Sequence, residues 1–179
     1  MPLEAKELSL RFPAFGTYLV GGQDKTVAAA LVERDAAAGE VLLAEGSVAS
    51  AVYLVADGAV AVTAGAPHPI EVGRFGAGAV LGEVSFLDGL PASATLTAVE
   101  PTRLYCMDRE RFARLREEQP RAAAAFQRGL CRTLAARVRE ATDQLRSLAP
   151  GGPALTDAPR QRGFLEALRA LFGSTRSEA

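Results

Sequence analysis

The sequence predicts a mainly β fold with flanking α-helices, and two observations carry this prediction. From about residue 26 to residue 108, turn-forming residues interrupt short apolar segments every 8–12 residues or so, which is the pattern of an antiparallel all-β domain. After Asp108 the apolar residues recur with a helical period instead. The length of 179 residues suits one domain with an appendage.

Eight strands are expected in the β region. The strands are Ala28–Arg34, Glu40–Ala44, Ala51–Val55, Val60–Thr63, Ile70–Phe75, Val80–Leu81, Ala94–Val99 and Thr102–Asp108. Pairs such as Ala38-Gly39 and Asp57-Gly58 separate them, because glycine allows the positive φ that a tight reversal needs. Residues 1–25 are expected to form an N-terminal segment with a short helix that packs on this domain.

Two helices are expected over residues 109–148. Asp108 can cap the first, which carries Phe112 and Leu115 on one face, and Pro120 can open a longer second helix. That second helix carries a stripe at alternating spacings of three and four residues: Cys131, Leu134, Val138, Ala141, Leu145 and Leu148. Such a stripe predicts a seam, either between two copies of the helix in a homodimer or against the chain's own barrel.

The segment LGEVSFLDGLPASATL, residues 81–96, resembles the phosphate-binding cassette of the cyclic nucleotide-binding domain family, which includes the catabolite activator protein and the protein kinase A regulatory subunit. The glycine turns and apolar strands of AAGEVLLAEGSVASAVYLVADGAVAV, residues 37–62, share the family's register. The resemblance covers residues 26–148. It implies an eight-stranded jelly-roll β-barrel over residues 26–108, with helices over residues 109–148.

The resemblance also implies a nucleotide pocket formed by Gly82, Glu83, Val84, Ser85, Ala92, Ser93, Ala94 and Thr95. It places Gly82 at a close backbone approach to the ligand and Glu83 against the ribose hydroxyl. The family's phosphate-binding arginine is replaced here by Ala92. Because a guanidinium pairs with the cyclic phosphate, we expect this pocket to be degenerate and to bind cyclic nucleotides weakly or not at all. Arg121, Arg128 and Arg132 on the long helix are candidates to replace that charge, because this helix covers the pocket in the family.

No residue pattern predicts an enzyme, a cofactor or a metal centre. His68 is the single histidine and lies between two prolines, Ser85 has no histidine partner, and Cys106 and Cys131 lack metal-ligand spacing. The N-terminus has no secretory signal and no apolar run is long enough to cross a membrane, so we expect a cytoplasmic protein with reduced thiols. The charge is divided unequally, since residues 1–100 hold 5 basic against 12 acidic residues and the remainder holds 15 against 9.

The C-terminal residues give the clearest indication of a partner. Residues 149–161 are rich in proline and glycine and predict a linker before a tail, residues 162–179. The apolar face of the tail is formed by Phe164, Leu165, Leu168, Leu171 and Phe172. So short an amphipathic helix needs a surface, which can be its own domain, a groove on a protein partner or assembly, or a membrane. The residues after 148 are too few for a winged helix-turn-helix, so no DNA-binding domain is expected.

These observations predict a non-enzymatic binding or regulatory module. In this interpretation a degenerate cyclic nucleotide-binding-like domain acts as an adaptor or scaffold subunit through its amphipathic tail. The alternative is a true sensor domain for cAMP, cGMP or another small molecule. A second alternative is an accessory protein that is carried as cargo into a protein shell, as a linker with an amphipathic tail suggests, or that lies on a membrane surface.

Overall fold

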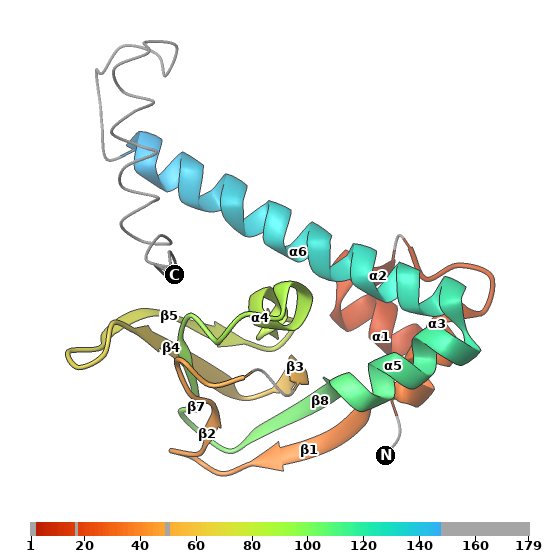
Figure 1. Cartoon of the computed structure of the whole chain (residues 1–179), viewed down its shortest axis with the longest axis horizontal. Coiled ribbons are helices and arrows are strands. Elements are labelled where there is room, and N and C mark those ends of the chain that lie inside the picture. Colours follow the sequence, from red (N-terminus) through yellow and green to blue (C-terminus); the bar gives the residue numbers. More distant parts are fainter. Residues whose placement is uncertain (1–2, 17, 49–50, 148–179) are drawn as a thin grey trace, which may run out of the picture. The chain divides into compact units, whose positions relative to one another are not determined.

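The computed structural model describes residues 3–16, 18–48 and 51–147 (Figure 1). The helices are α1 (Ala5–Arg11), α2 (Pro13–Gly16), α3 (Gln23–Ala30), α4 (Glu83–Asp88), α5 (Arg109–Glu118) and α6 (Pro120–Ser147). The strands are β1 (Val32–Ala36), β2 (Val41–Leu43), β3 (Ala51–Asp57), β4 (Ala59–Ala64), β5 (Ile70–Gly76), β6 (Val80–Leu81), β7 (Thr95–Ala98) and β8 (Thr102–Asp108). The chain divides into a unit of residues 1–138 and a unit of residues 139–179, of which the described residues 139–147 are helical.

The strands form two four-stranded antiparallel sheets, one ordered β1-β8-β3-β6 and the other β2-β7-β4-β5. Strand β3 is buried along residues 51–56, because one of its faces meets the opposite sheet and the other meets the helices. The Tyr53 hydroxyl on β3 donates a hydrogen bond to the Leu42 carbonyl on β2 at 2.8 Å, which ties the two sheets together. The predicted mainly β fold with flanking helices is therefore confirmed.

The helices α1, α2, α3, α5 and the first half of α6 lie on one side of the sheets (Figure 1). Their shared core includes Phe15, which stacks on Phe126 with ring centroids 5.2 Å apart. A Cβ atom added at Gly129 would lie 2.2 Å from the Phe15 ring, so the close approach of α2 to α6 requires a glycine there. The expected cap of the first C-terminal helix is present, since Asp108 accepts a hydrogen bond from the Arg111 amide at 2.7 Å.

The first expected strand, Ala28–Arg34, was wrong in its N-terminal half. Helix α3 continues to Ala30, and β1 begins only at Val32. Three consecutive alanines at the end of α3 favour a helix, and Leu31 adopts the extended conformation that ends it. The other seven expected strands match the observed ones to within a few residues, and α6 begins at Pro120 as predicted.

Candidate functional site

The cassette residues surround a cavity of about 190 Å³. Its lining residues are Leu43, Val62, Val72, Phe75, Leu81, Gly82, Glu83, Val84, Ser85, Ala92, Ser93, Ala94, Leu96 and Arg137. The structure thus brings together the residues named from the sequence, with the exception of Thr95. The Thr95 hydroxyl instead accepts a hydrogen bond from the Glu45 amide at 3.0 Å. We call this space the cassette cavity.

Gly82 turns the chain from β6 into α4 at the edge of the cassette cavity. Its φ of 78° lies in the left-handed region, and an added Cβ would lie 3.1 Å from the Ala51 carbonyl oxygen. Only glycine satisfies both conditions without strain. This turn places Glu83 at the first position of α4, with its side chain directed into the interior.

Glu83 is the most deeply buried charged residue of the cavity, with an exposed fraction of 1%. The guanidinium of Arg137, on α6, donates to Glu83 Oε1 through Nη1 and to the Val80 carbonyl through Nη2, the latter at 2.6 Å. The same guanidinium lies 5.0 Å from the centroid of the Phe75 ring. One arginine therefore joins α6, α4 and both sheets.

Burial raises the pKa of the Glu83 carboxyl above its ordinary value, and the Arg137 guanidinium partly opposes this rise by favouring the charged form. Removing the guanidinium would leave a buried carboxylate without its cation, which is costly. The carboxyl of Glu83 is thus held both by Arg137 of α6 and by a hydrogen bond from the Glu83 backbone amide.

Two backbone hydrogen bonds fix the main chain at Ala92. The Ala92 amide donates to the Ser47 carbonyl at 2.8 Å, and the Ala92 carbonyl accepts from the Gly46 amide at 2.7 Å. The alanine is buried, with 3% of its surface exposed, and its side chain lines the cassette cavity. Among the described lining residues, Arg137 is the one that carries a positive charge.

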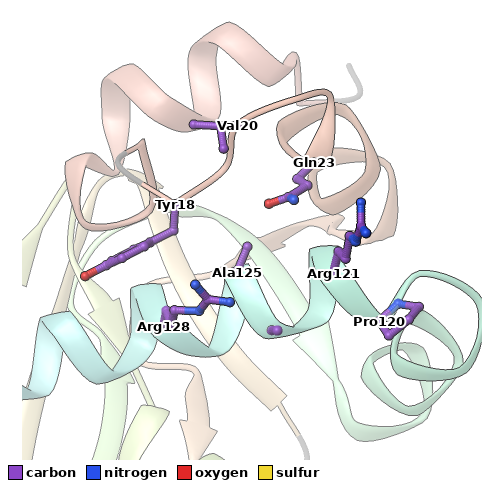
Figure 2. Close-up of a pocket in the computed structure, with 8 residues that line it drawn as sticks. Tyr18, Val20, Gln23, Pro120, Arg121, Ala125 and Arg128 are labelled. Carbon is purple, nitrogen blue, oxygen red and sulfur yellow. The ribbon is translucent and has the colours of Figure 1, made fainter.

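Arg137 was missed at the level of sequence. Arg121 and Arg128 line a different hollow (Figure 2), and Arg132 is exposed and does not line the cassette cavity. The signal that could have found Arg137 is the buried stripe of α6, which runs through Ala123, Phe126 and Leu130 and reaches residue 137 after two further turns.

The predicted stripe of α6 lies largely outside this buried face. Cys131 and Ala141 are exposed, Val138 and Leu145 are 65% and 54% exposed, and Leu134 is half-buried. None of these described stripe residues is fully buried, and the homodimer seam remains a prediction. Leu148 lies outside the described residues, as do the linker 149–161 and the tail 162–179 with its face of Phe164, Leu165, Leu168, Leu171 and Phe172.

Outside the cassette cavity, the described residues that carry reactive side chains include His68 and Cys106. His68 is exposed, and burial raises the pKa of the Cys106 thiol to about 11. Within the described ranges, no group of three or more histidine, cysteine, aspartate or glutamate residues is placed to hold a metal ion. In the same part of the chain, every helix is too short or too polar to cross a bilayer.

Comparison with known proteins points to one family. A family model described as the cyclic nucleotide-binding domain matches residues 33–119. A putative potassium channel protein of Rhodopseudomonas palustris is 34% identical over 98 residues, which are 55% of this chain and 24% of that protein. The cAMP-dependent protein kinase regulatory subunit of Blastocladiella emersonii is 33% identical over 88 residues, which are 48% of this chain and 22% of that protein. The chain thus spans less than a quarter of the length of these curated relatives.

A solved structure supports the same fold. A cyclic nucleotide-binding domain from Methylobacillus flagellatus superposes with a TM-score of 0.69 at 24% identity, over 83% of this chain and 88% of that one. At this level of identity the likeness concerns the fold alone.

Proposed function

Because residues 33–119 belong to the cyclic nucleotide-binding domain family, we propose that this regulatory domain serves here as a non-enzymatic adaptor that acts without cyclic nucleotide. The observation that carries the proposal is the buried methyl group of Ala92, which lines the cassette cavity where the family resemblance calls for a phosphate-binding arginine. A missing charged partner costs a buried anion on the order of 2–5 kcal/mol, or roughly 30- to 4000-fold in affinity.

The electrostatics of the cassette cavity also oppose an anionic ligand. The one cation in its described lining, Arg137, already donates to Glu83 and to the Val80 carbonyl. A cyclic phosphate would have to compete with Glu83 for this guanidinium and would lie near its carboxylate. The volume of about 190 Å³ is also below the roughly 300–1,000 Å³ of common small-molecule pockets.

One observation favours the alternative function, a true cyclic nucleotide sensor. Arg137 places a guanidinium at the cassette cavity from α6, and a guanidinium there is the group that a phosphate requires. The relative from Blastocladiella emersonii is named as a cAMP-dependent subunit. In this alternative the phosphate would take Arg137 from Glu83, and ligand binding would change the attachment of α6.

Isothermal titration calorimetry with cAMP and cGMP separates the two functions. We expect no binding in the micromolar range by the wild-type chain, and a gain of binding in Ala92→Arg. The matched control is Ala136→Arg, which adds the same charge at an exposed position of α6 and should gain nothing. Micromolar binding by the wild type that is lost in Arg137→Met would instead establish the sensor.

The adaptor function requires a contact surface, for which we propose the tail face of Phe164, Leu165, Leu168, Leu171 and Phe172. Burying large apolar side chains contributes about 1.5–3 kcal/mol each, and five of them side by side form a patch that monomers seldom expose. Deleting residues 160–179 should abolish capture of a protein partner and leave the melting temperature nearly unchanged. A melting temperature that falls by several degrees would place the tail in the core of its own domain.

We also propose a homodimer through the exposed stripe of α6. Val138 is 65% exposed and Leu145 is 54% exposed, so both side chains are accessible to a second helix. Light scattering at tens of micromolar should give the mass of a dimer, and Val138→Glu combined with Leu145→Glu should give that of a monomer. A monomeric mass for the wild type would refute this part of the proposal.

A further inference from the structure

A second hollow lies where the start of α6 meets the segment that joins α2 to α3 (Figure 2). Its volume is about 440 Å³, within the usual range of small-molecule pockets. Its lining residues are Tyr18, Val20, Gln23, Pro120, Arg121, Ala124, Ala125 and Arg128. None of these residues lines the cassette cavity, and we call this space the arginine hollow.

The sequence explains why the hollow exists. The floor is the first part of α6, where Ala124 and Ala125 present only methyl groups. The opposite wall is the connection that contains Tyr18 and Val20, and Tyr18 is packed in part against the helical core. Small side chains on one wall and a bulky anchored one on the other leave a space between the two walls.

The charged side chains that line the arginine hollow are both positive. Arg121 and Arg128 are seven residues apart on α6, so they lie on the same face about two turns from each other. Figure 2 shows both side chains extending from α6 toward the N-terminal segment. The lining contains no aspartate or glutamate, and neither guanidinium group forms a hydrogen bond or an ion pair with any residue in the described part of the chain.

We propose that the arginine hollow binds a small organic phosphate. Two guanidinium groups match the double negative charge and the several oxygens of a phosphate monoester better than the single charge of a carboxylate. The Gln23 side-chain amide supplies an uncharged hydrogen-bond donor, while the Tyr18 ring, Val20 and the alanines offer apolar contact to the organic part. This proposal is independent of the proposed function, because it involves no residue of the cassette.

Calorimetry on the full chain tests the proposal with inorganic phosphate, glycerol 3-phosphate and AMP as probes, and with glycerol and adenosine as their uncharged counterparts. We expect binding of at least one phosphate ester and no binding of the uncharged compounds. Arg121→Gln or Arg128→Gln should each weaken binding by roughly tenfold or more, and the double variant should abolish it.

Matched variants keep the test specific. Arg116→Gln combined with Arg132→Gln removes the same charge from exposed arginines that do not line the hollow, and it should leave binding unchanged. Ala124→Glu keeps both arginines but adds a carboxylate to the floor, and it should abolish binding. Because Arg121 and Arg128 are exposed, their replacement is not expected to unfold the chain.

Several outcomes would overturn the proposal. These are the absence of binding by any phosphate probe at millimolar concentration, or equal losses in the Arg121/Arg128 and Arg116/Arg132 double variants.

Sedimentation with phosphatidylcholine vesicles, with and without phosphatidic acid, distinguishes the source of the phosphate. Binding only to the acidic vesicles, lost in the Arg121/Arg128 variant, would replace the small molecule by a lipid headgroup. A cyclic nucleotide that binds here rather than in the cassette would be sensitive to Arg128→Gln and insensitive to Arg137→Met.

Discussion

Two sets of arginines on α6 have opposite surroundings: Arg137 on the one hand, and Arg121 and Arg128, nearer the start of the helix, on the other. Arg137 is held by a buried carboxylate, a carbonyl and an aromatic ring, at a cavity with little free volume. Arg121 and Arg128 are exposed, lack an acidic partner among the described residues, and line a hollow more than twice as large. An arginine that is already neutralised serves the attachment of a helix, whereas one without a counter-ion is available to an anion from solution.

The largest loss of stability is expected when Arg137 is replaced. Arg137→Met keeps an extended apolar side chain but leaves Glu83 buried without its cation, and it should lower the free energy of unfolding by about 3 kcal/mol near neutral pH. Urea denaturation followed by circular dichroism measures the change. The control Arg132→Met removes an exposed arginine of the same helix and should cost less than about 0.5 kcal/mol.

A second replacement, at Glu83, tests the cause of this loss of stability. If the loss in Arg137→Met arises from the unpaired carboxylate, then adding Glu83→Gln should recover a large part of it. A double variant that is no more stable than Arg137→Met would show that the arginine acts through packing on Phe75 instead.

The next effect concerns the contact that orients α6. Gly129→Ala would place a methyl group 2.2 Å from the ring of Phe15, which is fully buried and cannot swing away. We expect a loss of about 2 kcal/mol from overpacking, measured by urea denaturation. Helix propensity alone predicts that the variant is more stable, since alanine is favoured over glycine in a helix by about 1 kcal/mol. A stabilised Gly129→Ala variant would therefore contradict the close packing of α2 on α6.

The smallest effect is a dependence on pH. Glu83→Gln removes a carboxyl whose pKa burial raises above its ordinary value of 4.5. The folded state then holds this proton more tightly than the unfolded state, so the wild type loses stability relative to the variant as pH rises from about 4.5 through the raised pKa. Denaturation curves of both proteins between acidic and neutral pH measure the difference. If the wild type instead becomes more stable relative to the variant as pH rises, then Arg137 lowers the pKa of Glu83 by more than burial raises it.

The fold was predictable because its signals are local. The alternation of apolar segments with glycine turns specifies strands wherever they lie in space, and the helical stretches after Asp108 carry their own cap and opening proline. The first strand was misplaced because Ala28–Arg34 combines helix-forming alanines with strand-forming residues, and the boundary between the two is weakly specified by propensity.

The cassette could be identified from sequence for the same reason, since Gly82 to Ala94 are contiguous and their geometry follows from one turn and one short helix. For Arg137 the apolar stripe of α6 indicates only that the residue lies on the buried face of the helix. Its pairing with Glu83 could not be read from the sequence, because the two residues lie 54 positions apart along the chain. Arg128 and Arg137 point about 180° apart on α6, at the helical repeat of roughly 100° per residue, so the rotation of the helix decides which arginine faces the cassette. That rotation is set by the packing of Phe15 on Gly129 and Phe126, a contact between distant segments that no local pattern encodes.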